Sequence, residues 1–222
     1  ATAMKSQIFH TQAFVTIQER VRDLINSSPD FLSPNTAQSP RAAGDAIENI
    51  IAASFDSILG EYCGEYSTNF ARRAMADLAF KDSTGLYYIV DVKTHRAETK
   101  FNMPNLTSVE RLARFYEDDT NYFTVLLVNY AVDGYRATAT EVLFAPIEFL
   151  GWDCLTIGAL GWGQIQIANA NRVTVIPGYS RRRWMLEFCT ALLEFYPKEI
   201  AKIGERISRF EQVREYWLGK LD

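Results

Sequence analysis

The sequence predicts an α/β fold in which a mixed β-sheet core is flanked by helices. Three observations predict it. Apolar residues recur at helical spacing near both ends of the chain, a hairpin with a short DSTG turn lies between them, and residues 122–132 form a nearly continuous apolar run typical of a central strand. The length of 222 residues, with 48% hydrophobic and 23% charged residues, suits one globular domain over residues 1–222.

The first half of the chain alternates between helical patterns and a hairpin. Residues 11–27 carry apolar residues at helical spacing, and residues 43–60 form a strongly amphipathic segment that ends in glycine. Between them, residues 27–44 hold three prolines among polar residues, which predicts a long polar loop. Residues 72–82 and 86–94 predict the two strands of the hairpin.

The second half of the chain predicts further strands and a long last helix. A helix is expected after Pro104, and residues 136–146 predict a strand beside the central one. The segments CLTIG, QIQIAN and RVTVIP predict short strands around the glycine-rich turn GALGWG. Ser180 is expected to cap the last helix, which Pro197 should kink or interrupt.

Composition excludes some classes and leaves others open. No apolar run is long enough to cross a bilayer, and the opening ATAMKSQIFHTQ has no signal-peptide pattern. Cys63, Cys154 and Cys189 have no metal-ligand spacing, so we expect buried, reduced thiols in a cytoplasmic protein. The net charge of −4 neither suggests nor excludes nucleic acid, because a binding cleft needs only local positive charge.

Two carboxylates and a lysine gather on the expected hairpin. Strand alternation puts Asp91 and Lys93 on one side, and the short turn lets Asp77 approach from the paired strand. Like charges at that range repel, and Mg²⁺ resolves the conflict because it prefers oxygen ligands. This acid, acid-x-lysine spacing is the PD-(D/E)xK nuclease arrangement, in which a metal stabilises the charge that develops on a phosphodiester. The alternative is a surface hairpin with solvated charges and one weak ion pair.

A third carboxylate is available on the helix before the hairpin. Asp45 and Glu48 are three residues apart and therefore share a helix face. Glu48 lies among isoleucines in the sequence and could reach the metal site or fix Lys93. The alternative is an acid near a helix N-terminus that the helix dipole favours, and for Asp45 we prefer that interpretation.

Beyond these residues, three segments resemble the HincII-type restriction endonucleases, within the PD-(D/E)xK group that includes EcoRV. DVKTHRAETKFNMPNLTSVERLA, residues 91–113, is similar to the family's DVKT segment followed by Pro-Asn and a helix. AAGDAIENIIAASF, residues 42–55, resembles its Ala-Ala-Gly-acid-x-x-Glu helix start. GQIQI, residues 163–167, resembles its Gln-Ile-Gln strand. The three segments keep the family's order and, with the regions between them, cover most of the chain.

The resemblance implies a restriction-endonuclease-like fold with DNA-binding loops around a cleft. It implies a catalytic and DNA-recognition core over residues 43–200, with the helix in residues 1–30 as a candidate dimerisation element. Homodimers of this type bind double-stranded DNA, use Mg²⁺ and cut palindromes to blunt ends. The implied metal ligands are Asp77, Asp91 and the Val92 carbonyl, with Lys93 as the active-site lysine and Glu48 as a supporting acid.

The resemblance also implies DNA contacts on both sides of the duplex. Segments after the catalytic strand would approach the minor groove, the Pro-rich loop would contact the DNA from its other side, and a loop before the Gln-Ile-Gln strand would read bases. Gly158 stands where the family carries asparagine, so the recognition sequence is not carried over. The implied contacts are Thr94, Lys100, Phe101, Asn102 and Asn105, then Gln38, Ser39 and Arg41 of the loop, and Trp162 and Gln164 near the recognition strand.

Several other residues have two interpretations. Arg181, Arg182 and Arg183 open the last helix, where cations oppose the helix dipole; they would contact DNA phosphates or pair with nearby acids. Phe101 could wedge between bases, but an aromatic residue after a strand is more often in the core. His95 is expected to contact phosphate or lie on the surface, because the nuclease chemistry does not require it as a base.

The leading hypothesis is therefore a Mg²⁺-dependent type II site-specific deoxyribonuclease. One alternative is a repair or recombination nuclease with the same core, which reads DNA structure and not sequence. The other is a non-catalytic DNA-binding protein on the nuclease scaffold. The acid-acid-lysine set speaks against the second alternative, because a protein that only binds DNA has no use for carboxylates that face phosphate.

Overall fold

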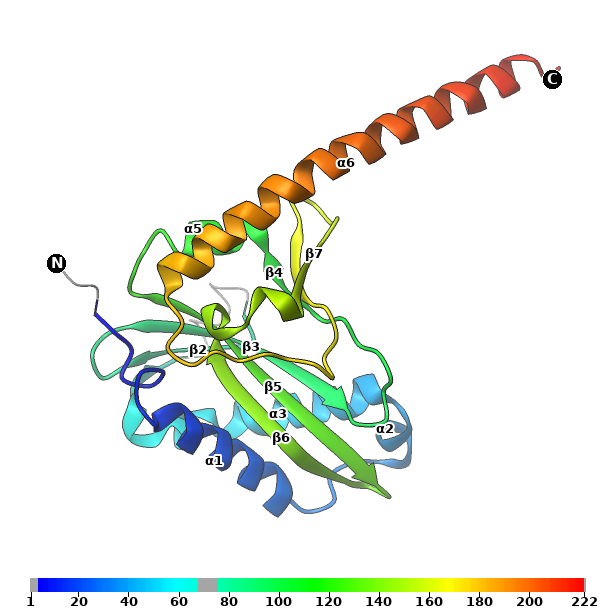
Figure 1. Ribbon diagram of the computed structural model, residues 1–222. Coiled ribbons are helices and arrows are strands. Elements are labelled where there is room, and N and C mark those ends of the chain that lie inside the picture. The colour runs from blue at the N-terminus through cyan, green and yellow to red at the C-terminus, as the bar shows by residue number, and fades with distance from the viewer. Residues whose placement is uncertain (1–3, 68–75, 222) are drawn as a thin grey trace.

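The computed structural model describes residues 4–67 and 76–221 and contains a mixed five-stranded sheet (Figure 1). The strand order is β1-β2-β3-β5-β6. β3 and β5 are parallel and the other neighbours are antiparallel, which confirms the mixed sheet. The strands are β1 (Cys63–Tyr66), β2 (Leu78–Asp82), β3 (Tyr87–Arg96), β5 (Asn121–Asp133) and β6 (Arg136–Pro146).

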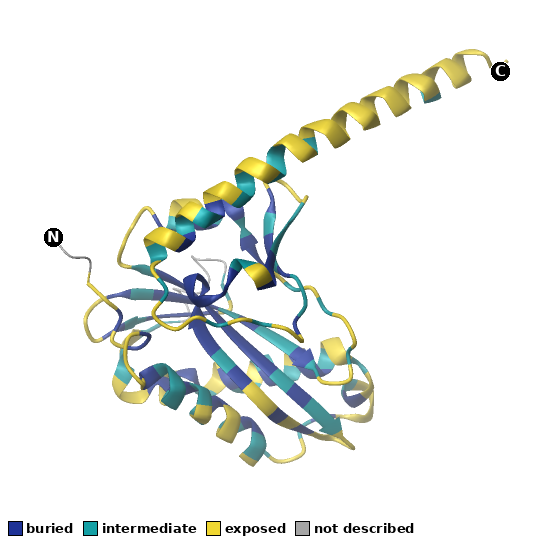
Figure 2. Cartoon of the chain, in the orientation of Figure 1, coloured by how far each residue is buried: buried dark blue, intermediate teal, exposed yellow. Residues whose placement is uncertain are grey.

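Helices α1 (Ala13–Ser27) and α3 (Pro40–Leu59) cover one face of this sheet (Figure 1). Their buried side chains fall on a single stripe, as the helical spacing in the sequence predicts. Alternate residues of β3, such as Tyr88 and Val90, point into the core that they share with these helices, whereas Ile89 belongs to a second core on the opposite face. The sheet is therefore buried on both faces (Figure 2).

The opposite face is covered by a smaller antiparallel sheet in the order β4-β8-β7, together with the start of the last helix. β4 turns directly into α5 where the Ser108 side chain accepts from the N–H of Arg111. A helix is expected directly after Pro104. The first residues of that segment instead form the strand β4, because they pair with β8, and helix α5 follows. These elements are β4 (Asn105–Ser108), α5 (Val109–Phe115), β7 (Leu155–Gly158) and β8 (Gln164–Ile167).

Other expected elements also differ from those in the structure. The Pro-rich loop contains the short helix α2 (Pro34–Gln38), and α3 already begins at Pro40. Ser33 and Ser39 cap these helices, and proline suits the first helical position because it needs no N–H there. RVTVIP contributes only an isolated bridge from Val175 to Leu150. Part of the strand expected over 72–82 falls on residues 68–75, outside the described residues.

The last helix, α6 (Arg181–Leu218), spans 38 residues. It continues through Pro197, so the expected interruption is wrong: the proline removes one backbone donor, but helical bonds on both sides persist. Trp184 and Phe188 anchor its beginning in the second core. Its outer half projects away from the body and is exposed nearly all round (Figures 1 and 2).

Three short 3-10 turns complete the described part of the chain: η1 (Gly60–Tyr62), η2 (Ile147–Phe149) and η3 (Trp152–Cys154). All three cysteines are free; Cys154 is buried as expected, Cys63 is half-buried and Cys189 is exposed. Among the described helices, none is long and apolar enough to cross a membrane.

Candidate active site

The hairpin of β2 and β3 brings the acid-acid-lysine set together. Leu78 pairs with Val90 across the hairpin, which leaves Asp77 at the entry to β2 beside the Asp91 end of β3. The Asp77 carboxylate accepts a hydrogen bond of 2.7 Å from the Val92 N–H. The Lys93 ammonium donates to one oxygen of Asp91 over 3.2 Å, so these two side chains share one side of the strand.

The start of α3 packs closely on the same strand. A Cβ atom added to Gly44 would lie 2.4 Å from the Thr94 hydroxyl oxygen, so a larger residue there would force one of the two side chains to shift. Glu48 follows one turn later. Burial raises the pKa of its carboxyl group to about 7, with further contributions from the negative charges of Asp77 and Asp45, while Lys93 opposes them. Glu48 is therefore electrostatically part of the hairpin site.

Asp91 lies at the centre of this cluster. Burial raises the pKa of its carboxyl group to about 7; Lys93 opposes the rise, and the charges of Asp77 and Glu48 add to it. Its Oδ2 atom is buried and has no hydrogen-bond partner. A buried carboxylate oxygen without a partner is costly, so this atom is suited to accept a cation or a donor from a ligand.

The residues present fit the Mg²⁺ ion that the resemblance implies. Among the residues that the structure describes, no group of three or more His, Cys, Asp or Glu side chains is arranged to hold a metal. The ligand set that the resemblance implies does not require such a group of three, because it consists of two carboxylates, Asp77 and Asp91, and the Val92 carbonyl. Two hard-oxygen side chains, one of which has a carboxylate oxygen without a hydrogen-bond partner, are typical of Mg²⁺ sites.

His95, near the end of β3, holds the segment that follows this strand. It is 2% exposed, so the expectation of a surface or phosphate-contacting residue is wrong. Its Nε2 lies 2.8 Å from the Asn171 Oδ1, and Asn171 donates to the carbonyls of Thr99 and Lys100. The Asn102 amide lies 3.5 Å from the other ring nitrogen. Sequence reasoning missed Asn171, because nothing local marks a residue 76 positions away as its partner.

This clamp presents Phe101 to solvent. Its side chain is 61% exposed, which contradicts the core interpretation and leaves it free to meet a ligand. The other implied contacts that are exposed are Lys100, Asn105, Gln38, Arg41, Trp162 and Arg182, whereas Thr94, Asn102, Ser39 and Gln164 are half-buried.

In the smaller sheet, Gly158 of β7 lies beside the flexible side chain of Gln166 on β8. A Cβ atom there would lie 2.8 Å from the side chain of Gln166, which crosses over this position. Gln166 donates to the Asn105 Oδ1 over 2.6 Å and so links β8 to β4. Gln166 belongs to the Gln-Ile-Gln strand but was missed as an individual residue, because only the pairing of the strands shows which glutamine reaches Asn105.

Arg181 is directed into the protein. Its guanidinium donates to Glu148 over 2.8 Å and lies over the rings of Tyr116 and Tyr122, at 4.1 and 4.3 Å from their centroids. Its side chain is only 20% exposed. The structure thus corrects the predicted DNA contact of Arg181 in favour of pairing with a nearby acid. Arg183 also pairs with an acid, Glu187, so Arg182 is the member of the triplet without an ion pair among the described residues.

Comparison with known proteins adds no family to this geometry. No protein-family model matches the chain, and no curated protein sequence matches it significantly.

Proposed function

We propose that this protein is a Mg²⁺-dependent endonuclease that hydrolyses phosphodiester bonds of double-stranded DNA. One observation carries the proposal: a buried, unpartnered oxygen of Asp91 lies in a cluster with Asp77, Glu48 and Lys93. A structural ion pair between Lys93 and Asp91 does not need the further negative charges of Asp77 and Glu48 nearby, because mutual repulsion would cost stability. A site that receives a cation uses this arrangement directly.

The side chains divide the work in the proposed reaction. Bound Mg²⁺ would supply positive charge to the phosphodiester oxygens. Asp77 and Asp91 hold it, and the hydrogen bond from the Val92 N–H orients the Asp77 carboxylate. Lys93, half-buried and attached to Asp91, orients a water molecule on the same side of β3. Glu48 supports Lys93 from α3 through its charge.

The finer features of the proposal come from the resemblance to HincII-type enzymes. They are cleavage at a short palindromic site, blunt ends, and action as a homodimer. Exposed Lys100, Phe101 and Trp162 favour contact with DNA, because aromatic and cationic side chains on clamped segments can meet bases and phosphates.

The test is cleavage of a sequenced plasmid in Mg²⁺, followed by sequencing of the ends. We expect discrete cuts at one short palindrome from the wild-type protein. Asp91→Ala and Lys93→Ala should each lower the cleavage rate by at least about 10³-fold, because each removes a group that acts on the reacting atoms. Binding of the cleaved sequence in Ca²⁺ should remain.

The alternatives give different results in the same experiment. Cuts at branched or damaged positions without a common sequence would indicate a repair or recombination nuclease. Binding without any cleavage would indicate a DNA-binding protein on this scaffold. Wild-type cleavage by either variant would show that the assigned site is wrong.

A further inference from the structure

The outer half of α6 carries a row of large, exposed apolar side chains. The exposed fraction of the large apolar residues in this row lies between 50% (Ile203) and 70% (Ile200). Together with Arg214, which interrupts the apolar row, they recur at alternating intervals of three and four residues, which is the seven-residue repeat of a coiled coil. In that repeat, the a positions are Ile200, Ile207 and Arg214, and the d positions are Ile203, Phe210 and Trp217.

An apolar row of this kind requires cover. Exposed large apolar residues scatter singly on most proteins, whereas a continuous row marks an interaction surface. A helix that extends into solvent also lacks the packing that stabilises most helices in proteins. Figure 1 shows the outer half of α6 pointing away from the body, so no other described element covers it.

We propose that a second copy of this chain covers this row, with the two α6 helices paired as a parallel coiled coil. In a parallel pair, each g residue faces the e residue five positions later on the other helix. Arg206 would then face Glu211 of the other copy, twice by symmetry, and Val213 would face Leu218. Within the described residues, neither Arg206 nor Glu211 forms an ion pair in its own chain. The flanks are thus complementary to themselves in this direction.

The polar residue Arg214 at an a position favours a pairing with one specific register. A single polar residue at an a position lowers coiled-coil stability but fixes register and the number of helices. The remaining surface of the outer helix carries acids and bases together, including Lys198, Lys202, Glu205 and Arg209. A membrane-surface helix would carry mainly basic residues there, so the mixed charge favours a protein partner.

Helix α1, which the sequence offered as a candidate dimerisation element, packs its apolar side chains within its own chain. Ile17, Val21 and Ile25 of α1 are fully buried against the main sheet. The exposed row on α6 is therefore the better candidate for a self-complementary interface. In a parallel pair, both bodies lie at the same end of the coiled coil.

Sedimentation velocity of the full chain over a concentration series tests the pairing. We expect a dimer with twice the 25.2 kDa chain mass. Ile203→Glu combined with Ile207→Glu should raise the dissociation constant at least about 100-fold, because each dimer would bury four carboxylates in place of apolar groups. The matched control, Ser208→Glu with Gln212→Glu, places the same charges away from the row and should change it less than about 3-fold.

Two further variants test the direction. Arg206→Glu should weaken the dimer about 10-fold, and adding Glu211→Arg should restore it. In a Cys189→Ser background, Arg214→Cys should form an intermolecular disulfide on mild oxidation, whereas Gln212→Cys on the outer face should not.

Three results would overturn the proposal. The first is a chain that stays monomeric, with or without binding to anionic phospholipid vesicles. The second is a dimer whose dissociation constant does not change in the Ile203→Glu and Ile207→Glu variant. The third is a dimer that forms no Arg214→Cys disulfide and whose dissociation constant does not change in Arg206→Glu. None of these results depends on DNA cleavage, so the pairing and the proposed reaction stand or fall separately.

Discussion

The carboxyl groups of Glu48 and Asp91 are buried close to each other's charge and to that of Asp77. Both have a pKa of about 7, mainly because burial disfavours the charged form. Neither residue type predicts this: a glutamate near a helix start is usually solvated and ionised. At the scale of single residues, the raised pKa of each acid therefore depends on its position in the fold and not on whether it is aspartate or glutamate.

Glu48→Gln is expected to stabilise the metal-free protein at alkaline pH. The raised pKa of Glu48 means that the folded state binds its proton more tightly than the unfolded state. Wild-type stability therefore falls as the pH rises from about 4.5 to about 7, and glutamine removes this fall. The shift corresponds to at most about 3 kcal/mol, and solvent screening of this half-buried group reduces the expected gain to about 1 kcal/mol.

Urea unfolding in EDTA at pH 5 and pH 8.5 measures this difference. The gain from Glu48→Gln should be larger at pH 8.5. Glu205→Gln, on the exposed part of α6, serves as the control and should show no such dependence. An equal effect of Glu48→Gln at both pH values would contradict the raised pKa.

At the scale of elements, the contact of α3 with β3 positions the helix acid. Gly44 lies against the Thr94 side chain, so one turn of α3 closely approaches the strand that carries Asp91 and Lys93. The helical stripe of Ile47, Ile51 and Phe55 then buries the helix against the sheet. Packing of one glycine thus determines where Glu48 lies.

Gly44→Ala is expected to destabilise the protein by about 1 kcal/mol. Overpacking costs about 1–3 kcal/mol, and the higher helix propensity of alanine offsets part of that. Thr94→Ala removes the clashing hydroxyl, so the double variant should recover most of the loss. Chemical unfolding of the two single variants and the double variant measures the coupling, and a Gly44→Ala protein more stable than the wild type would refute the tight contact.

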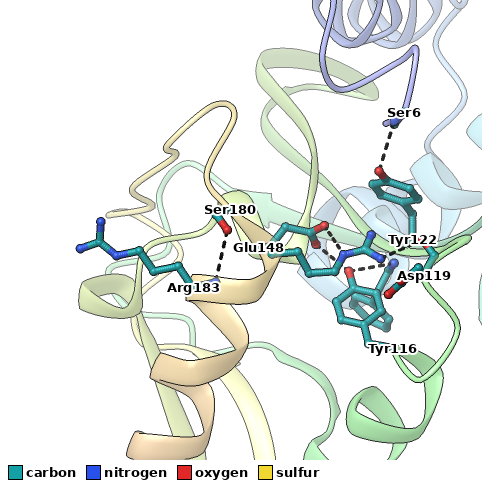
Figure 3. A network of polar contacts seen from close by, with 9 residues as sticks. Ser6, Tyr116, Asp119, Tyr122, Glu148, Ser180 and Arg183 are labelled. Carbon is teal, nitrogen blue, oxygen red and sulfur yellow. Dashed lines mark hydrogen bonds and ion pairs between the residues drawn. The ribbon is translucent and has the colours of Figure 1, made fainter. Parts of the chain in front are cut away.

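At the scale of the whole molecule, one buried polar network joins distant segments. Arg181 of α6 pairs with Glu148, which accepts from the Tyr116 hydroxyl after α5. The Tyr122 hydroxyl of β5 accepts from the Ser6 N–H near the start of the chain (Figure 3). The network therefore fastens the beginning of α6, and with it the projecting half, to the body.

Glu148→Ala is expected to cost about 3 kcal/mol of unfolding free energy. It leaves the Arg181 guanidinium largely buried without its acid and removes the partner of Tyr116. Lys202→Ala breaks the exposed ion pair with Glu199 and should cost less than about 0.5 kcal/mol. Similar losses in the two variants, measured by chemical unfolding, would show that the network does not fasten α6.

The mixed α/β class, the hairpin and the place of Asp77, Asp91 and Lys93 on it could be predicted from the amino-acid sequence. These features depend on local periodicity and turn residues, which a single chain displays directly. The strand over 136–146 and the helix in 11–27 were predictable for the same reason. Mg²⁺, DNA and the homodimer stay predictions, since they concern molecules outside the chain.

The environment of each side chain could not be predicted and is known from the three-dimensional fold. It buried His95, exposed Phe101, turned Arg181 inward and brought Glu48 to the hairpin. The physical reason is that burial and pairing depend on segments far apart in the sequence, such as Asn171 against His95. The long reach of α6 beyond Pro197 belongs here too, because a proline lowers helix stability without determining whether the neighbouring turns hold.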